Sequence, residues 1–138
     1  MVYLLDTSAL LAHYRNEPGA SRLQALFTEE ESEVLIASVS IPEFARRLRD
    51  LGQDEAQIRR VLADYRQVLD GIVAIDVPVA EASVEILRRA SGRLPLVDAL
   101  IAAAAHVRRA TLVHRDAHLR AIPAALLSSL DLEANPIP

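Results

Sequence analysis

The amino-acid sequence predicts an α/β fold in which helices cover both faces of a central, mostly parallel sheet of four or five strands. Its strand-like segments are short continuous apolar runs, which are typical of strands buried on both faces. These runs alternate with longer segments whose apolar residues recur at helical spacing. The chain has 138 residues, without an internal repeat or a linker. We therefore expect one domain over residues 1–138.

The first half of the chain is expected to contain two strands and four helices. Apolar runs mark the strands, and the helices are separated by Pro18, by an acidic run over 29–33 and by Gly52. Asp54 is a suitable cap for the fourth helix, and Gly71 is expected to end it. The predicted elements are a strand over 2–5, helices over 8–14 and 20–27, a strand over 34–37, and helices over 40–51 and 54–70.

The second half continues the alternation of strands and helices. Asp76 and Pro78 are suited to opening a helix, and Pro95 to opening the alanine-rich helix that follows. The alternation of Leu130 and Leu132 with acidic residues predicts a weak edge strand. The predicted elements are strands over 72–75 and 111–113, helices over 76–90 and 95–107, a helical turn over 117–120, an edge strand over 130–133, and a loose tail over 135–138.

Composition narrows the class of protein. Apolar residues make up 51% of the chain, but no stretch approaches the roughly 20 apolar residues that span a bilayer. The chain contains no Cys, and no basic segment follows Met1, so we expect a cytoplasmic protein without a membrane partner. The net charge of −4 argues against coating nucleic acid by bulk electrostatics. It permits local contacts to a few phosphates. All basic residues are Arg, which excludes mechanisms that need Lys.

Four acidic residues stand next to or within apolar runs, where acids are uncommon. Asp6 and Asp116 follow predicted strands, whereas Glu43 and Asp98 lie in the first turns of predicted helices. In an open parallel sheet these positions share one edge, where ligands bind. Two charges about 4 Å apart repel by about 4 kcal/mol at an effective dielectric of 20. A hard cation offsets such repulsion, and oxygen ligands without Cys suit Mg²⁺ or Mn²⁺.

Each acid also has a structural explanation when it is taken alone. Asp6 and Asp116 are suited to capping the helices that follow them. The segment Ser40-Ile41-Pro42-Glu43 matches a capping box. Asp98 near a helix start would interact favourably with the helix dipole. For any single residue the structural explanation is preferred, but the ordered set of four favours a shared site.

The segments around these acids resemble the four acidic motifs of PIN domains. They are most similar to the VapC-type toxins of toxin–antitoxin pairs, in order, spacing and total length. The resemblance covers essentially the whole chain, and the motif segments are Leu4-Leu5-Asp6-Thr7-Ser8-Ala9-Leu10, Ser40-Ile41-Pro42-Glu43-Phe44, Leu96-Val97-Asp98-Ala99-Leu100-Ile101-Ala102 and Leu112-Val113-His114-Arg115-Asp116. It implies a three-layer α/β/α fold and a metal-dependent endoribonuclease.

The resemblance assigns metal-binding and catalytic roles to Asp6, Glu43, Asp98 and Asp116. Asp6 and Asp98 would bind Mg²⁺ or Mn²⁺ directly, and the other two acids would complete the site or hold the water that the metal activates. RNA would be cut to 5′-phosphate and 3′-hydroxyl ends. A cognate antitoxin would block the site, and the chain would form a homodimer or a toxin–antitoxin hetero-oligomer.

Several further residues are candidates for auxiliary roles. Thr7 or Ser8 matches the hydroxyl position after the first acid. His114 stands where many family members have Ser or Thr, and it either replaces their hydrogen bond or lies outside the site. His114 and His118 are candidate substrate contacts. Candidate phosphate contacts are Arg115, Arg46 and Arg93.

The sequence also bears on functions other than a ribonuclease. The departure at His114 permits a catalytically weak PIN-like module whose task is to bind a protein. A phosphoacceptor fold is disfavoured, because a receiver domain needs a late Lys and a haloacid-dehalogenase-like phosphatase needs an acid where Ser8 stands. A P-loop nucleotidase also lacks its Lys.

Overall fold

The computed structural model describes residues 1–133, and these contain one five-stranded sheet. All strand pairs are parallel, in the order β3-β2-β1-β4-β5. The register aligns Leu5 with Ile36 on β2 and with Val113 on β4, so the carboxyl ends of the central strands meet at one edge. The strands are β1 (Val2–Leu5), β2 (Glu33–Ala37), β3 (Gly71–Val73), β4 (Thr111–His114) and β5 (Ser129–Asp131).

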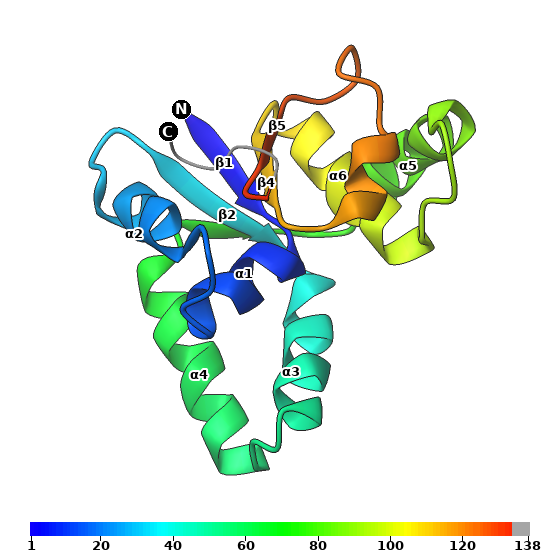
Figure 1. The fold of residues 1–138 in the computed structure, drawn as a ribbon. Coiled ribbons are helices and arrows are strands. Elements are labelled where there is room, and N and C mark those ends of the chain that lie inside the picture. The colour runs from blue at the N-terminus through cyan, green and yellow to red at the C-terminus, as the bar shows by residue number, and fades with distance from the viewer. Residues whose placement is uncertain (134–138) are drawn as a thin grey trace.

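Six α-helices and one short 3₁₀-helix surround this sheet in the described part of the chain. Figure 1 shows α5 and α6 on one side of the sheet and α1 to α4 on the other. The helices are α1 (Thr7–Tyr14), α2 (Ala20–Thr28), α3 (Ser40–Asp50), α4 (Glu55–Val68), α5 (Val77–Arg89), α6 (Leu96–Val107) and η1 (Ala117–Ala121).

Alternate residues of each central strand face two separate cores. Leu4 and Leu35 pack with the alanines of α6 and with Ile86 of α5. Their neighbours Leu5 and Ile36 pack on the opposite face against α1, α3 and α4. Because both faces of the strands are buried, the strands read as continuous apolar runs rather than alternating ones. The predicted three-layer α/β/α fold is confirmed, and of the four or five strands predicted the sheet has five.

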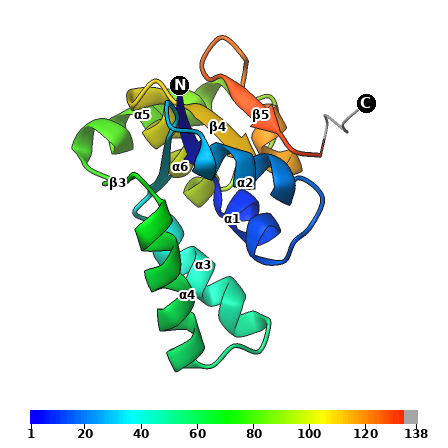
Figure 2. The same cartoon turned by 90° about the vertical axis from the view of Figure 1, so that its left-hand side faces the viewer.

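Helices α3 and α4 form a hairpin that projects away from the sheet (Figures 1 and 2). Gly52 adopts a φ of +91° in the turn between them, a conformation that glycine tolerates without strain. Asp54 caps α4 in a reciprocal capping box with Gln57, as the sequence indicated. The hairpin packs along its length with the core that contains Leu5 and Ile36, through Phe44 and Leu48 of α3 and Ile58 of α4 among others.

Two local predictions are wrong. Gly71 does not end α4, which stops at Val68; it opens β3 instead. Ser40 is the first residue of α3, as predicted, but it does not cap the helix, because Val39 occupies the N-cap. Glu43 is therefore not part of a capping box. The predicted loose tail lies outside the described residues.

No helix in the described residues has the length and apolar character needed to cross a membrane.

Candidate functional site

The four acidic residues line one cleft at the carboxyl edge of the sheet. The cleft has a volume of about 450 Å³. Its acids come from four segments far apart in the sequence: the β1–α1 junction, the first turn of α3, the first turn of α6, and the β4–η1 junction. The remaining lining residues are Thr7, Ser8, Leu11, Arg15, Glu17, Arg46, Arg47 and Arg115. The predicted convergence of Asp6, Glu43, Asp98 and Asp116 is thus present in the structure.

Asp6 lies at the floor of this cleft and is only 2% exposed. Its Oδ2 caps α1 by accepting the Ser8 amide at 3.0 Å and the Ser8 hydroxyl at 2.5 Å. Its Oδ1 is buried and has no hydrogen-bond partner among the described residues. Burial raises the pKa of Asp6 to about 6; the Ser8 hydrogen bonds oppose this rise, and the charges of Glu43 and Asp116 add to it. The capping role therefore accounts for the Oδ2 atom of Asp6 but not for the buried, unpartnered Oδ1 atom.

Asp98 lies in the first turn of α6 and is 8% exposed. Its pKa is raised to about 7, mainly by burial and in addition by the charges of Asp6, Asp116 and Glu43, against a lowering effect of His118. The favourable dipole at the start of a helix does not offset these effects. Asp98 therefore experiences the electrostatic cost of the cluster directly.

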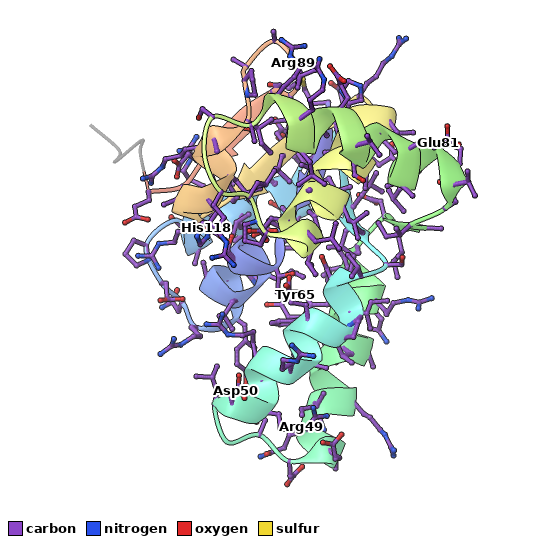
Figure 3. The ribbon with its side chains drawn as sticks, turned by 90° about the vertical axis from the view of Figure 1, so that its right-hand side faces the viewer. Arg49, Asp50, Tyr65, Glu81, Arg89 and His118 are labelled. Atoms are coloured by element: carbon purple, nitrogen blue, oxygen red, sulfur yellow. The ribbon has the colours of Figure 1, made fainter. Side chains whose placement is uncertain are left out.

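Asp116 caps η1, and its carboxylate contacts both the backbone and the side chain of His118. Its Oδ1 accepts the His118 amide at 2.9 Å and lies 3.1 Å from the His118 Nδ1. Ligand atoms of Asp98, Asp116 and His118 all lie within 4.8 Å of one another, the only such grouping among residues 1–133. His118 is labelled in Figure 3, far from Arg49 and Asp50 at the tip of the α3–α4 hairpin.

Glu43 reaches the cleft from the first turn of α3 and is partly exposed. The start of α3 is tied to the start of α1 through buried hydroxyls, because Thr7 Oγ1 donates to Ser40 Oγ at 3.3 Å. Ser40 thus joins two of the acid-bearing helices where the sequence suggested a cap.

Arg115 joins the first and last acidic motifs. Its amide donates to Ser8 Oγ at 2.9 Å, and the same hydroxyl donates to Asp6. Its guanidinium Nη1 lies 3.1 Å from Glu17 Oε2, with both side chains about a quarter exposed. The Nε of Arg115 is buried and has no partner in the described chain. Arg46 also lines the cleft, whereas Arg93 lies in an exposed loop and is not among its lining residues.

His114 is the last residue of β4 and lies outside the cleft. It is 1% exposed, and burial lowers its pKa. Its Nδ1 accepts the amide N–H of Asp116 at 3.2 Å. Of the two possibilities left open by the sequence, the structure favours a place outside the site. The His114 side chain accepts a hydrogen bond from the backbone of the last acid and does not line the acidic cleft.

A family model described as PIN domain matches residues 3–125. The chain belongs to the PIN-domain family. The matched region includes all four acids and all but the last strand, so the resemblance seen in the sequence is confirmed.

Solved structures with the same fold include chains of toxin–antitoxin complexes. VapBC2 from Rickettsia felis, bound to a promoter DNA fragment, is 21% identical with a TM-score of 0.74, covering 95% of this PIN domain chain and 100% of the other. A toxin–antitoxin complex from Klebsiella pneumoniae is 23% identical with a TM-score of 0.70, and the match covers 94% of this chain and 97% of the other. FitAcB from Neisseria gonorrhoeae is 20% identical with a TM-score of 0.72, and the match covers 96% of this chain and 99% of the other. A comparison with curated proteins found no match.

Arg15 and Glu17 are charged residues of the PIN domain cleft that the sequence did not single out. Helical spacing contains a signal for Arg15, because Ser8, Leu11 and the C-cap residue Arg15 are separated by three and four residues along α1. Glu17 follows the end of that helix, and no local pattern marks it.

The residues of the cleft fit a hard divalent cation. Carboxylate oxygens predominate, and the unpartnered Oδ1 of buried Asp6 is an acceptor that the protein itself leaves unsatisfied. The raised pKa values of Asp6 and Asp98 show that negative charge is unfavourable here without a counter-charge. Mg²⁺ and Mn²⁺ prefer such oxygen donors, and the imidazole of His118 is a donor that Mn²⁺ accepts more readily than Mg²⁺.

Proposed function

We propose that this PIN domain is a metal-dependent endoribonuclease and the toxin of a toxin–antitoxin pair. The observation that supports this most directly is the convergence of four carboxylates, one with a buried unpartnered oxygen, in a cleft that also contains four arginines. An acidic floor alone would repel RNA. Arginines next to it attract phosphates and orient them by planar, bidentate contacts.

The proposed reaction is in-line displacement at phosphorus by water. The bond between phosphorus and the 3′ oxygen breaks, the 3′ oxygen leaves with a proton as a hydroxyl, and the phosphate remains on the 5′ end of the other fragment. A bound Mg²⁺ or Mn²⁺ would supply Lewis-acid stabilisation of the phosphoryl oxygens and lower the pKa of a water molecule.

The residues of the chain have distinct tasks in this proposal. Asp6 and Asp98 bind the cation, with Asp6 held in one orientation by Ser8. Glu43 and Asp116 complete the site or orient the attacking water through hydrogen bonds. His118 adjoins Asp98 and Asp116 and is a further candidate donor. Arg46 and Arg115 contact phosphates next to the one that is cut.

The solved structures of similar fold support the partner proposal. Several are toxin–antitoxin complexes, and we infer that this chain likewise binds a cognate antitoxin that blocks its cleft. We also propose assembly as a homodimer or a toxin–antitoxin hetero-oligomer, in the cytoplasm.

The metal requirement is tested with the purified chain and single-stranded RNA. Cleavage is expected with Mg²⁺ or Mn²⁺, with none after EDTA treatment, and with 5′-phosphate and 3′-hydroxyl product ends. Single-stranded DNA serves as the comparison substrate. Cleavage that persists in EDTA would contradict the metal mechanism. Failure to cut RNA together with no heat of Mn²⁺ binding in calorimetry would favour the protein-binding module instead.

Glu17 is expected to weaken RNA binding, because its carboxylate occupies the guanidinium of Arg115. The Glu17→Gln variant should therefore bind a single-stranded RNA oligonucleotide about two- to fivefold more tightly, since a partly exposed ion pair is worth about 0.5–1 kcal/mol. Fluorescence anisotropy in EDTA measures binding without cleavage.

Glu81→Gln is the matched control for this variant. It makes the same change of charge on α5, where Glu81 is exposed and distant from His118 (Figure 3). If both variants raise the affinity equally, the effect is one of net charge, and the competition between Glu17 and phosphate for Arg115 is refuted.

A further inference from the structure

His114 is a buried polar side chain with no direct place in the cleft. It is 1% exposed and borders a separate hollow behind the site, lined also by Leu119 and Arg120 of η1. An imidazole in such a position needs a hydrogen-bond partner to offset the loss of water. The Nδ1 atom has such a partner in the backbone of the last acid.

The connection from His114 to Asp116 is short and anchored at both ends. The carbonyl of His114 accepts the Leu132 amide at 2.8 Å, next to the strand pairing of β4 with β5. On the other side of β4, the carbonyl of Val113 accepts the Asp6 amide at 2.9 Å. The imidazole Nδ1 then accepts the Asp116 amide at 3.2 Å, two residues further along the chain. These bonds fix the backbone from the strand end to the acid.

We propose that His114 is a positioning residue that fixes the backbone of Asp116, so that the Asp116 carboxylate faces Asp98 across the cleft. The proposal rests on the proposed function, since it concerns a carboxylate of the metal site. Groups that orient a ligand from behind commonly change metal affinity by about 10- to 100-fold when they are removed.

The acceptor atom, rather than the bulk of the ring, is the element that this role requires. An Asn side chain places its Oδ1 at the same number of bonds from the backbone as the His Nδ1, and Asn commonly accepts the amide two residues on. Leu fills a similar volume without an acceptor. Gln is polar but moves its acceptor one bond further out. These three substitutions separate hydrogen bonding from packing.

The test compares His114→Asn, His114→Leu and His114→Gln with the unmodified chain. Calorimetry measures Mn²⁺ affinity, and nuclear magnetic resonance measures the hydrogen-exchange rate of the Asp116 amide. We expect His114→Leu to bind Mn²⁺ at least about tenfold more weakly and to exchange the Asp116 amide faster. His114→Asn should retain Mn²⁺ affinity to within about threefold of the unmodified chain and keep the amide protected, since it preserves the acceptor. Thermal unfolding identifies any variant that fails to fold, and His114→Gln replaces His114→Leu in the comparison if the latter does.

Two outcomes would overturn the positioning role. Equal losses of Mn²⁺ affinity in the Asn and Leu variants would show that only packing matters, and unchanged affinity in both would show that the hydrogen bond is dispensable. If the unmodified chain bound no Mn²⁺, the proposed function would fail. The hydrogen-exchange rate of the Asp116 amide would then still test the positioning role, because that measurement needs no metal. Faster exchange in His114→Leu than in His114→Asn would support the role, and equal rates would refute it.

Discussion

The Asp98→Asn substitution is expected to reduce RNA cleavage by about a hundred- to a thousandfold. Asp98 is a proposed direct ligand, and its carboxylate is buried beside those of Asp6 and Asp116. The amide is nearly isosteric but neutral, so a cation would lose one charged oxygen donor. A bound metal stabilises the transition state by several kcal/mol, and each tenfold in rate corresponds to about 1.4 kcal/mol. Cleavage of a labelled RNA under single-turnover conditions measures the effect.

Asp50→Asn is the matched control for this experiment. Asp50 is exposed at the end of α3, at the tip of the projecting hairpin (Figure 3). Its replacement by Asn is the same chemical change, made far from the cleft. It should leave the rate within about twofold, as is usual for a surface substitution. Far-ultraviolet circular dichroism should be unchanged in both variants. Undiminished cleavage by a folded Asp98→Asn protein would remove Asp98, and with it the metal site as described, from the mechanism.

The sequence predicted the acidic site well because its determinants are local. Asp6 and Asp116 follow apolar strands, and Glu43 and Asp98 begin helices; in a parallel sheet each of these positions falls on one edge. Right-handed crossovers then leave little freedom in how the strands are ordered. Position along an element, rather than any contact, was enough to predict which four side chains converge.

The parts that sequence could not predict depend on contacts between distant segments. Ser40 looked like a cap, but its hydroxyl accepts the hydroxyl of Thr7, 33 residues away. Glu17 enters the cleft only because its loop passes beside Arg115, 98 residues further on. Gly71 carries no local mark that separates a helix stop from a strand start. Such outcomes are decided by tertiary packing, which overrides local propensity.

Asp98 and Asp6 are also expected to make the metal-free protein less stable as the pH rises. Their pKa values are about 7 and about 6 in the folded chain, against an ordinary value of 3.8. The folded state therefore holds these protons more tightly than the unfolded state does. Their contribution to the free energy of unfolding is fully present below pH 4 and is lost as the pH rises to about 7.

Comparison with the Asp98→Asn variant isolates the contribution of the Asp98 carboxyl, including its repulsion from the other acids of the cleft, because groups that do not interact with it cancel. In EDTA the two proteins should have similar free energies of unfolding at pH 4. The variant should become the more stable one above pH 4, by on the order of 2–4 kcal/mol at pH 7–8, after allowance for solvent screening in the open cleft. Urea denaturation at a series of pH values measures this difference.

Mn²⁺ should narrow the stability advantage of the variant at pH 7.5. A ligand that binds only the folded state adds about 2.7 kcal/mol to the free energy of unfolding at a concentration 100 times its Kd. The unmodified chain should gain more stability from Mn²⁺ than the variant, because the variant lacks one donor. Asp50→Asn should follow the unmodified chain throughout. A stability difference that is the same at pH 4 and pH 8 would mean that burial and the neighbouring charges do not raise the pKa of Asp98. A Mn²⁺ effect equal in both proteins would mean that Asp98 does not bind the cation that offsets the charge of the cleft.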